Sequence, residues 1–161
     1  MQAEPQKEHL WLQQLVGEWT SEAECSMGPG QPSTKSYGTE RVRMVGGLWM
    51  VGEGQGEMPG GGTATMIMTL GYDPQKKRYL GTWIGSMMTH MWHYDGEMDA
   101  SDRILTLSAE GPSMAGDGTM AKYQDIIEIK SKDHRTLSSR VLGPDGTWNH
   151  FMTASHYRRR K

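Results

Sequence analysis

Apolar and polar residues alternate along much of the chain, and the alternation is clearest between residues 63 and 94. Met, Leu and Tyr side chains occupy every second position from Met66 to Tyr72, with Ile, Thr and Gly between them. A period of two is typical of a β-strand that turns one face to a core. The stretch therefore predicts three successive strands joined by two hairpins.

The first hairpin predicts the register of its two strands. An Asp-Pro pair at 73–74 opens a polar turn. Pairing Tyr72 with Tyr79 then sets Met68 opposite Trp83, and directly opposed residues share one face of a sheet. The bulky face is interpreted as the inside of the protein.

The second hairpin agrees with the first. A two-residue loop at Met87 and Met88 sets Trp83 opposite Trp92, and a longer loop is the alternative because these residues lack Asn-Gly turn chemistry. A slip of one residue in either turn would exchange the two faces. The predicted inner residues of the three strands are Met66, Met68, Leu70, Tyr72, Gly81, Trp83, Gly85, His90, Trp92 and Tyr94.

The remaining chain predicts one helix and further strands. Residues 4–16 indicate a short helix that covers one end of a barrel and ends at Gly17. Its expected apolar stripe is Leu10, Trp11, Leu15 and Val16. Further strands are expected over 17–27, 34–46, 48–57, 103–110, 120–130, 135–142 and 148–157.

These elements predict a single domain over residues 1–161. One helix followed by about ten strands in sequential hairpins favours an all-β, antiparallel, up-and-down ten-stranded barrel over residues 17–158. A barrel of this kind has room for one small ligand when its inner side chains do not fill it.

Strand parity assigns further positions. Trp19, Ser21, Ala23, Cys25 and Met27 share a small inner face of the first strand, which would leave room inside. Val42 and Met44 are predicted inward, with Arg41 and Arg43 outward. The parity of 48–57 stays open because the loop after it has no defined register.

The last strands follow the same logic. Tyr123, Asp125, Ile127 and Ile129 share one face of the strand 120–130. In the final hairpin, pairing Val141 with Trp148 turns Trp148, His150 and Met152 inward and Phe151 outward.

Composition excludes several functions. Lysine and arginine total 17 and aspartate and glutamate total 19, so the net charge is −2. This balance argues against a nucleic-acid surface or a polybasic membrane anchor. No apolar run approaches the ~18 residues of a membrane-spanning helix, and the first residues lack a secretory signal pattern. The basic run 158–161 is interpreted as a solvated chain end.

The single cysteine, Cys25, excludes an intrachain disulfide. It fits a reducing compartment, so the cytoplasm is the expected location. No basic residue is adjacent in sequence, and a buried, inert thiol is expected.

Three segments carry a resemblance to a known family. G-E-W at 17–19 follows the predicted helix and opens the first strand, as the G-x-W signature does in lipocalins. Together with GYDPQKKRYLGTWIGSM and the C-terminal TASHYRRR, the segment HLWLQQLVGEWT resembles the uncharacterised lipocalin-like family called domain of unknown function 1579. The resemblance covers nearly the whole chain and implies a calycin-type barrel with an internal cavity and no agreed activity. By the same analogy, Trp19 packs across the closed end of the barrel as a structural residue.

The leading hypothesis is a binding protein for a small apolar or aromatic molecule, with Trp83 and Trp92 as flat walls. Inward polar groups would orient this ligand or satisfy one another. The candidate ligand-binding residues are Met66, Met68, Trp83, His90, Trp92, Tyr94, Tyr123, Asp125, His150 and Met152.

Two alternatives stay open. One is a cofactor-free enzyme of the cyclase or isomerase type, in which His90 or His150 acts as general base and Asp125 orients it. It requires these side chains to converge. The other is a filled barrel that binds no ligand and acts through its surface or as a homodimer.

Metal and cofactor sites have weaker support. His90 and His93 are three residues apart in a strand and point to opposite faces, so no metal site is predicted. Haem bound through an inward His150 rests on fold analogy alone, and no cofactor is predicted.

Overall fold

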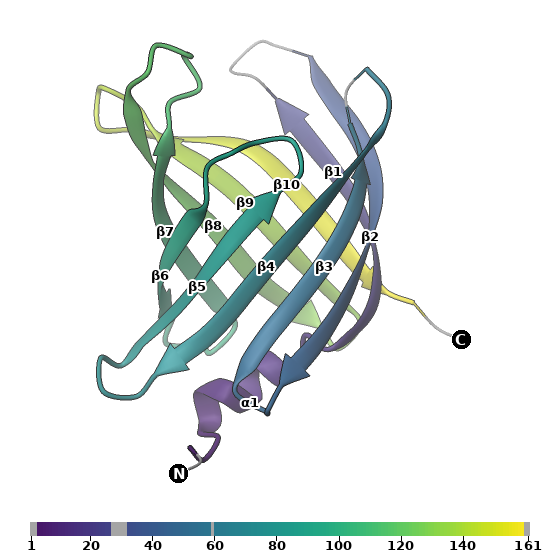
Figure 1. Ribbon diagram of the computed structural model, residues 1–161, viewed down its shortest axis with the longest axis vertical. Coiled ribbons are helices and arrows are strands. Elements are labelled where there is room, and N and C mark those ends of the chain that lie inside the picture. The colour runs from purple at the N-terminus through teal and green to yellow at the C-terminus, as the bar shows by residue number, and fades with distance from the viewer. Residues whose placement is uncertain (1–2, 27–31, 59, 160–161) are drawn as a thin grey trace.

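The computed structural model describes residues 3–26, 32–58 and 60–159, which form a closed antiparallel barrel of ten strands with one short helix (Figure 1). Each strand pairs with the next along the chain, and β1 closes against β10. The predicted all-β, up-and-down fold is confirmed. The elements are α1 (Lys7–Gln13), β1 (Gly17–Ser26), β2 (Ser33–Val45), β3 (Trp49–Glu57), β4 (Thr63–Asp73), β5 (Arg78–Gly85), β6 (Trp92–Met98), β7 (Ile104–Pro112), β8 (Met120–Ser131), β9 (His134–Leu142) and β10 (Trp148–Arg158).

The hairpins between β4 and β6 have the predicted register. Tyr72 opposes Tyr79, and Met68 opposes Trp83. Trp83 in turn opposes Trp92, which joins all three strands through one row of inward side chains. The bulky face is therefore the inside, as predicted.

The β5–β6 connection is the longer of the two alternatives. The strand pairing stops at Trp83 and Trp92, and residues 86–91 leave the sheet. A tight two-residue hairpin turn requires positive φ angles, which Met87 and Met88 disfavour. The predicted two-residue turn is wrong, and the extra length creates a loop at the open end of the barrel (Figure 1).

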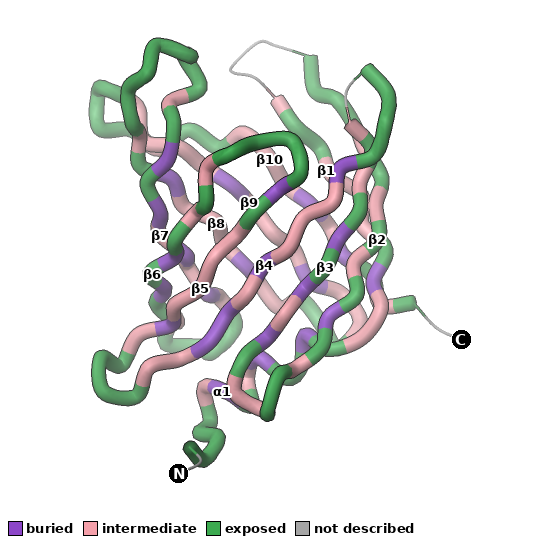
Figure 2. Tube along the Cα trace, in the orientation of Figure 1, coloured by how far each residue is buried: buried purple, intermediate pink, exposed green. Residues whose placement is uncertain are grey.

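The parity of β3 is settled by its position between β2 and β4. Gly52 and Gly54 are buried, as is Met50, whereas Glu53 is exposed. Figure 2 shows the resulting alternation of buried and exposed positions along this strand. Glycines therefore occupy successive inward positions of β3.

The register of the last hairpin differs from the prediction. Val141 opposes Asn149 rather than Trp148, and the register shifts between His150 and Met152. A β-bulge places one extra residue on a strand and changes which side chains point inward. Beyond the bulge Met152 is inside, as predicted.

Because of the bulge, three residues lie on the opposite side of the barrel from the one predicted. His150 opposes Arg140, and Trp148 packs under the guanidinium of Arg140 at 5.0 Å, so both lie on the outer face. Phe151 instead lies in the wall of the interior cavity. The predictions of an inward Trp148, an inward His150 and an outward Phe151 are therefore wrong.

Helix α1 covers the end of the barrel at the bottom of Figure 1. His9 accepts a hydrogen bond at Nδ1 from the backbone of Gln6 (2.9 Å), and its Nε2 then donates to the carbonyl of Tyr72 (3.2 Å). The first contact caps the helix, and the second ties it to β4. Trp11 donates from Nε1 to the carbonyl of Asp102 (2.6 Å), which anchors the helix to the β6–β7 turn.

The helix is shorter than the predicted segment 4–16 because its last residues continue as a turn of i→i+3 hydrogen bonds. Leu12 and Leu15 are fully buried, whereas Leu10 is 57% exposed and Val16 is 37% exposed. The predicted stripe is right at Leu15 and wrong at Leu10 and Val16. No helix in the described residues is long and apolar enough to cross a membrane.

Trp19 is clamped between two arginines at the closed end. The guanidinium of Arg135 lies 4.5 Å from the ring centroid, and that of Arg158 lies 4.2 Å from it. The indole Nε1 donates to the carbonyl of Leu15 (2.9 Å). Stacked guanidinium groups and a satisfied N–H suit a buried tryptophan, and the expected structural role of Trp19 is confirmed.

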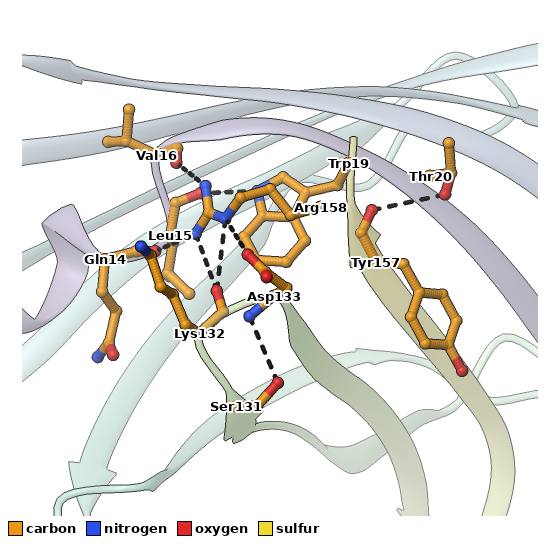
Figure 3. Close-up of polar contacts among 10 residues, drawn as sticks. All are labelled: Gln14, Leu15, Val16, Trp19, Thr20, Ser131, Lys132, Asp133, Tyr157 and Arg158. Atoms are coloured by element: carbon orange, nitrogen blue, oxygen red, sulfur yellow. Dashed lines mark hydrogen bonds and ion pairs between the residues drawn. The ribbon is translucent and has the colours of Figure 1, made fainter. Parts of the chain in front are cut away.

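Arg158 joins the end of the chain to its beginning (Figure 3). Its guanidinium donates to the carbonyls of Gln14 (3.0 Å), Val16 (2.5 Å) and Lys132 (3.3 Å). It also forms an ion pair with Asp133 at 3.4 Å. One planar, five-donor side chain therefore connects the α1–β1 segment, the β8–β9 turn and β10.

The position of Arg158 explains why the first residue of the G-x-W motif is a glycine. Gly17 has a φ of +138°, and a Cβ there would lie 2.4 Å from Nη1 of Arg158. Only glycine combines this backbone with so close an approach. The interpretation of 158–161 as a solvated chain end is wrong at Arg158, whose donors are engaged by backbone carbonyls.

Candidate functional site

The barrel is packed at one end and hollow at the other. The closed end is filled by an apolar core that includes Leu12, Leu15, Trp19, Val42, Met50, Leu70, Tyr79, Leu105 and Ile127. Along β1 the next inward residues, Ser21, Ala23 and Cys25, line a cavity of about 690 Å³. The cavity extends to the loops opposite α1, where methionines line it: Met58, Met87, Met88 and Met114.

Small inward residues create this space. The lining includes the small residues Ser21 and Ala23 on β1, as the sequence predicted for a roomy inner face, and Gly52, Gly54 and Gly56 on β3. A glycine in a strand leaves the volume that a side chain would occupy. Strands β1 and β3 therefore contribute small side chains and open volume to one side of the cavity.

Aromatic rings form the opposite wall. Trp92 packs edge to face against His90 and Tyr123, with ring centroids 4.8 and 4.9 Å apart. A Cβ at Gly111 would lie 2.1 Å from the Trp92 ring, so this glycine lets the indole lie against β7. Edge-to-face packing holds aromatic rings in a defined orientation, which makes this a fixed wall.

Nine of the ten predicted ligand-binding residues line the cavity, and His150 does not. Those in the lining are Met66, Met68, Trp83, His90, Trp92, Tyr94, Tyr123, Asp125 and Met152. His150 is exposed, with Nε2 hydrogen-bonded to Thr153 Oγ1 at 2.6 Å. That the nine bind a ligand stays a prediction.

The three candidate catalytic residues do not converge. His150 is on the outer face, and Nε2 of His90 is 3.0 Å from a backbone carbonyl oxygen of β7. Asp125 accepts its hydrogen bonds from Tyr94 and Ser139 rather than from a histidine. Neither of the His–Asp pairs on which the enzyme hypothesis depends is formed.

Within the residues that the structure describes, no group of three or more His, Cys, Asp and Glu side chains is arranged to hold a metal ion. His90 lines the cavity and His93 is exposed, in line with their opposite parity. Since His150 is outside the barrel, it cannot serve as an axial ligand to a haem within the cavity.

Cys25 is exposed at the open end of β1 and lines the cavity. The prediction of a buried thiol is therefore wrong. Desolvation by the surrounding chain still raises the pKa of Cys25 above its ordinary value, which favours the protonated, less reactive thiol. The predicted neighbour Met27 lies outside the described residues.

Asp125 is the most informative polar residue of the wall. Its Oδ1 accepts from Ser139 Oγ (2.6 Å), and its Oδ2 accepts from the Tyr94 hydroxyl (2.5 Å). Burial raises the pKa of Asp125, and these two hydrogen bonds partly oppose the rise. Burial and the adjacent carboxylate raise the pKa of Tyr94 well above its usual value, so Tyr94 stays a hydroxyl donor.

A second polar group, at the cavity floor, was missed from the sequence. Arg135 donates from Nη2 to Oε1 of Glu40, and Nε2 of His156 lies 3.8 Å from the same oxygen. Glu40 and His156 line the cavity, while Arg135 lies behind them against Trp19. A Cβ at Gly52 would lie 2.7 Å from Glu40 Oε2, so the glycine leaves space for this carboxylate.

The alternation of inward and outward residues indicates that Glu40 and Arg135 both point into the barrel. Glu40 is two residues before Val42, which was predicted inward, and Arg135 is two residues before Leu137 on the inner face of β9. What parity did not show is that closure of the barrel brings the two together across 95 residues of sequence.

We expect the free energy of unfolding to fall as the pH is lowered from 7 to 4, in part through His156. Burial, reinforced by Arg135, lowers the pKa of His156 to about 4, although Glu40 raises it. In the unfolded chain a histidine has a pKa of about 6.5. The unfolded state therefore binds the proton first, and stability is lost between about pH 6.5 and 4, by on the order of 2–3 kcal/mol.

Urea unfolding of His156→Gln measured across this pH range should show a flatter profile than the unaltered protein. The other groups that face His156, namely Glu40, Arg135 and His134, remain in the variant. His93→Gln, at an exposed position, is the matched control and should leave the slope unchanged. An unaltered slope in His156→Gln would show that His156 is not the titrating group.

The fold and the cavity define the class of this protein as a ten-stranded antiparallel β-barrel with an internal cavity that opens away from its helix. The chain belongs to the family described as "Protein of unknown function (DUF1579)", whose profile matches residues 4–159. The resemblance seen in the sequence is thereby confirmed. A comparison with curated proteins gives no match.

Solved structures share the barrel. Rv2717c from M. tuberculosis is 12% identical, with 98% of this chain and 100% of that chain covered and a TM-score of 0.61. The S-type phycobiliprotein lyase CPES from Guillardia theta is 13% identical, with 98% and 99% covered and a TM-score of 0.57. EF1p2_mFAP2b bound to DFHBI is 14% identical, with 94% and 98% covered and a TM-score of 0.50. At these identities the likeness is one of fold.

Proposed function

We propose that this protein is a lipocalin-like binding protein that holds a small apolar or aromatic molecule in the cavity of its barrel. The observation that carries the proposal is the hollow half of the barrel, with its methionine and aromatic lining. Its volume of about 690 Å³ falls within the range of about 300–1,000 Å³ that is common for ligand pockets. Flexible methionine side chains adapt to the shape of a ligand, while the Trp83 and Trp92 rings offer flat surfaces.

Two solved structures of the same fold are in line with a small-molecule function. EF1p2_mFAP2b is bound to DFHBI, and CPES is a phycobiliprotein lyase. At 14% and 13% identity they support the general function but do not identify the ligand, which must be inferred from the chemistry of the walls. The single cysteine accords with a cytoplasmic location, which is part of the proposal.

The open half of the barrel argues against the filled-barrel alternative. A packed interior would leave no volume between Ser21 and Ala23 on one side and Trp92 and Tyr123 on the other, yet all four line one cavity. Well-packed interiors contain few voids larger than a water molecule. A cavity of this size is therefore unlike ordinary packing defects.

Titration with N-phenyl-1-naphthylamine, a neutral probe that fluoresces in apolar surroundings, tests the proposal. We expect a saturable rise in probe fluorescence at one probe per chain. Native mass spectrometry of gently purified protein is the second measurement, and a bound small molecule that leaves on denaturation would also support the proposal. The absence of both probe binding and a bound mass would overturn it.

A further inference from the structure

The cavity has an unbalanced charge. The acidic residues among the described lining residues are Glu40, Glu57 and Asp125, and the same lining contains no lysine or arginine. Glu40 is paired with Arg135, and Glu57 is exposed near the open end. Asp125 is thus the carboxylate of the inner wall that has no cationic partner in the described part of the chain.

Asp125 can accept further hydrogen bonds from a cation. Its two hydrogen bonds come from the neutral hydroxyls of Tyr94 and Ser139. Each carboxylate oxygen can accept more than one hydrogen bond. A carboxylate that is removed from water without a counter-charge is costly, and a positively charged group within the cavity would offset that cost.

Aromatic rings flank this carboxylate on two strands. Trp92 and Tyr94 are successive inward residues of β6, and Tyr123 and Asp125 are successive inward residues of β8. The intervening strand β7 contributes the small Ala109 opposite Tyr123, which lets the rings of Trp92 and Tyr123 meet across it. Aromatic faces attract cations through their quadrupole. The wall around Asp125 therefore attracts a cation through the carboxylate and through the neighbouring rings.

We infer that the cavity selects ligands with a cationic nitrogen on an apolar or aromatic scaffold, with Asp125 as the counter-charge. This inference rests on the proposed function and specifies the ligand class for the same cavity. An anionic ligand, such as a carboxylate of similar shape, would meet Asp125 without a lining lysine or arginine to offset the repulsion. Selectivity of this kind comes from an unfavourable pairing as much as from a favourable one.

Three naphthalene compounds of similar size test the inference by displacement of N-phenyl-1-naphthylamine at pH 7. They are 1-naphthylmethylamine, which is a cation, 1-naphthalenemethanol, which is neutral, and 1-naphthoate, which is an anion. We expect the amine to bind tightest and the carboxylate weakest. In Asp125→Asn the amine should lose roughly tenfold or more in affinity, because a hydrogen bond to a charged group is lost. The neutral alcohol should lose less, so the preference for the amine over the alcohol should shrink.

Asp95→Asn is the matched control, because it removes the same charge from β6 on the outer face of the barrel. It should leave the order of the three compounds unchanged. If circular dichroism shows that Asp125→Asn does not fold, Asp125→Ser removes the same charge and takes its place. The order of the three affinities in the unaltered protein tests the inference in either case.

The outcomes separate the two proposals. Equal affinities, a preference for the carboxylate, or a preference for the amine that persists without the Asp125 charge would overturn the inference. In each of these cases the probe still binds, so the proposed function stands. If neither the probe nor any of the three compounds binds, the proposed function fails, and the inference fails with it.

Discussion

Gly54→Phe is expected to weaken binding of N-phenyl-1-naphthylamine by roughly tenfold or more, because the added ring occupies the space that the ligand needs. Gly54 is an inward residue of β3 and lines the cavity. A Cβ there would lie 3.4 Å from the carbonyl oxygen of Thr39 and 3.8 Å from Cε of Met66. The first carbon therefore fits, and the ring extends into open volume.

The fold should tolerate this change. A strand residue gains β propensity when glycine is replaced by phenylalanine, and the new ring fills empty space rather than packed core. Glu53→Phe is the matched control, because it adds the same ring one residue away on the exposed outer face. Probe titrations of the two variants should differ, and equal binding by both would place the binding site outside the cavity.

Trp19→Ala is expected to lower the free energy of unfolding by about 3–5 kcal/mol, the range for large aromatic truncations in a core. The ring is 2% exposed and supports the guanidinium groups of Arg135 and Arg158. Its removal leaves a cavity and takes away the surface on which both cations are stacked. Trp49→Ala is the control, because that ring is 42% exposed on the outer face, and a loss of at most about 1 kcal/mol is expected there.

Urea unfolding followed by far-ultraviolet circular dichroism measures both variants without relying on tryptophan emission. Arg158→Lys should fall between them, since an ammonium group cannot reproduce the planar set of donors to Gln14, Val16 and Lys132. Similar losses for Trp19→Ala and Trp49→Ala would mean that the clamp is not the main stabilising feature of the closed end.

The sequence allowed the barrel to be predicted because local rules decide most of it. Alternation from Met66 to Tyr72 and the polar turn before Tyr79 were sufficient to set the register of β4 against β5. The same parity placed Tyr94, Asp125 and Met152 inside. These features depend on neighbours close in sequence, which a pattern of period two records directly.

The candidate site was predictable as far as parity holds and no further. A single β-bulge between His150 and Met152 reversed the side of the barrel on which His150 lies. No residue pattern in β10 indicated this bulge. The haem hypothesis, which required an inward His150, therefore lost its geometry, and the enzyme hypothesis lost its His–Asp pairs. The binding hypothesis kept nine of its ten residues in the cavity lining.

By itself the sequence determined the strand succession, the inner face of the central strands and nine of the residues that line the cavity, because an extended chain places alternate side chains on opposite sides. Only the tertiary structure decided that one half of the barrel is hollow, since this depends on how side chains from ten strands meet. It likewise decided that Arg135 meets Glu40, while Asp125 has no ion pair among the described residues. Long-range pairings of this kind arise when the sheet closes, and closure joins residues that no local pattern connects.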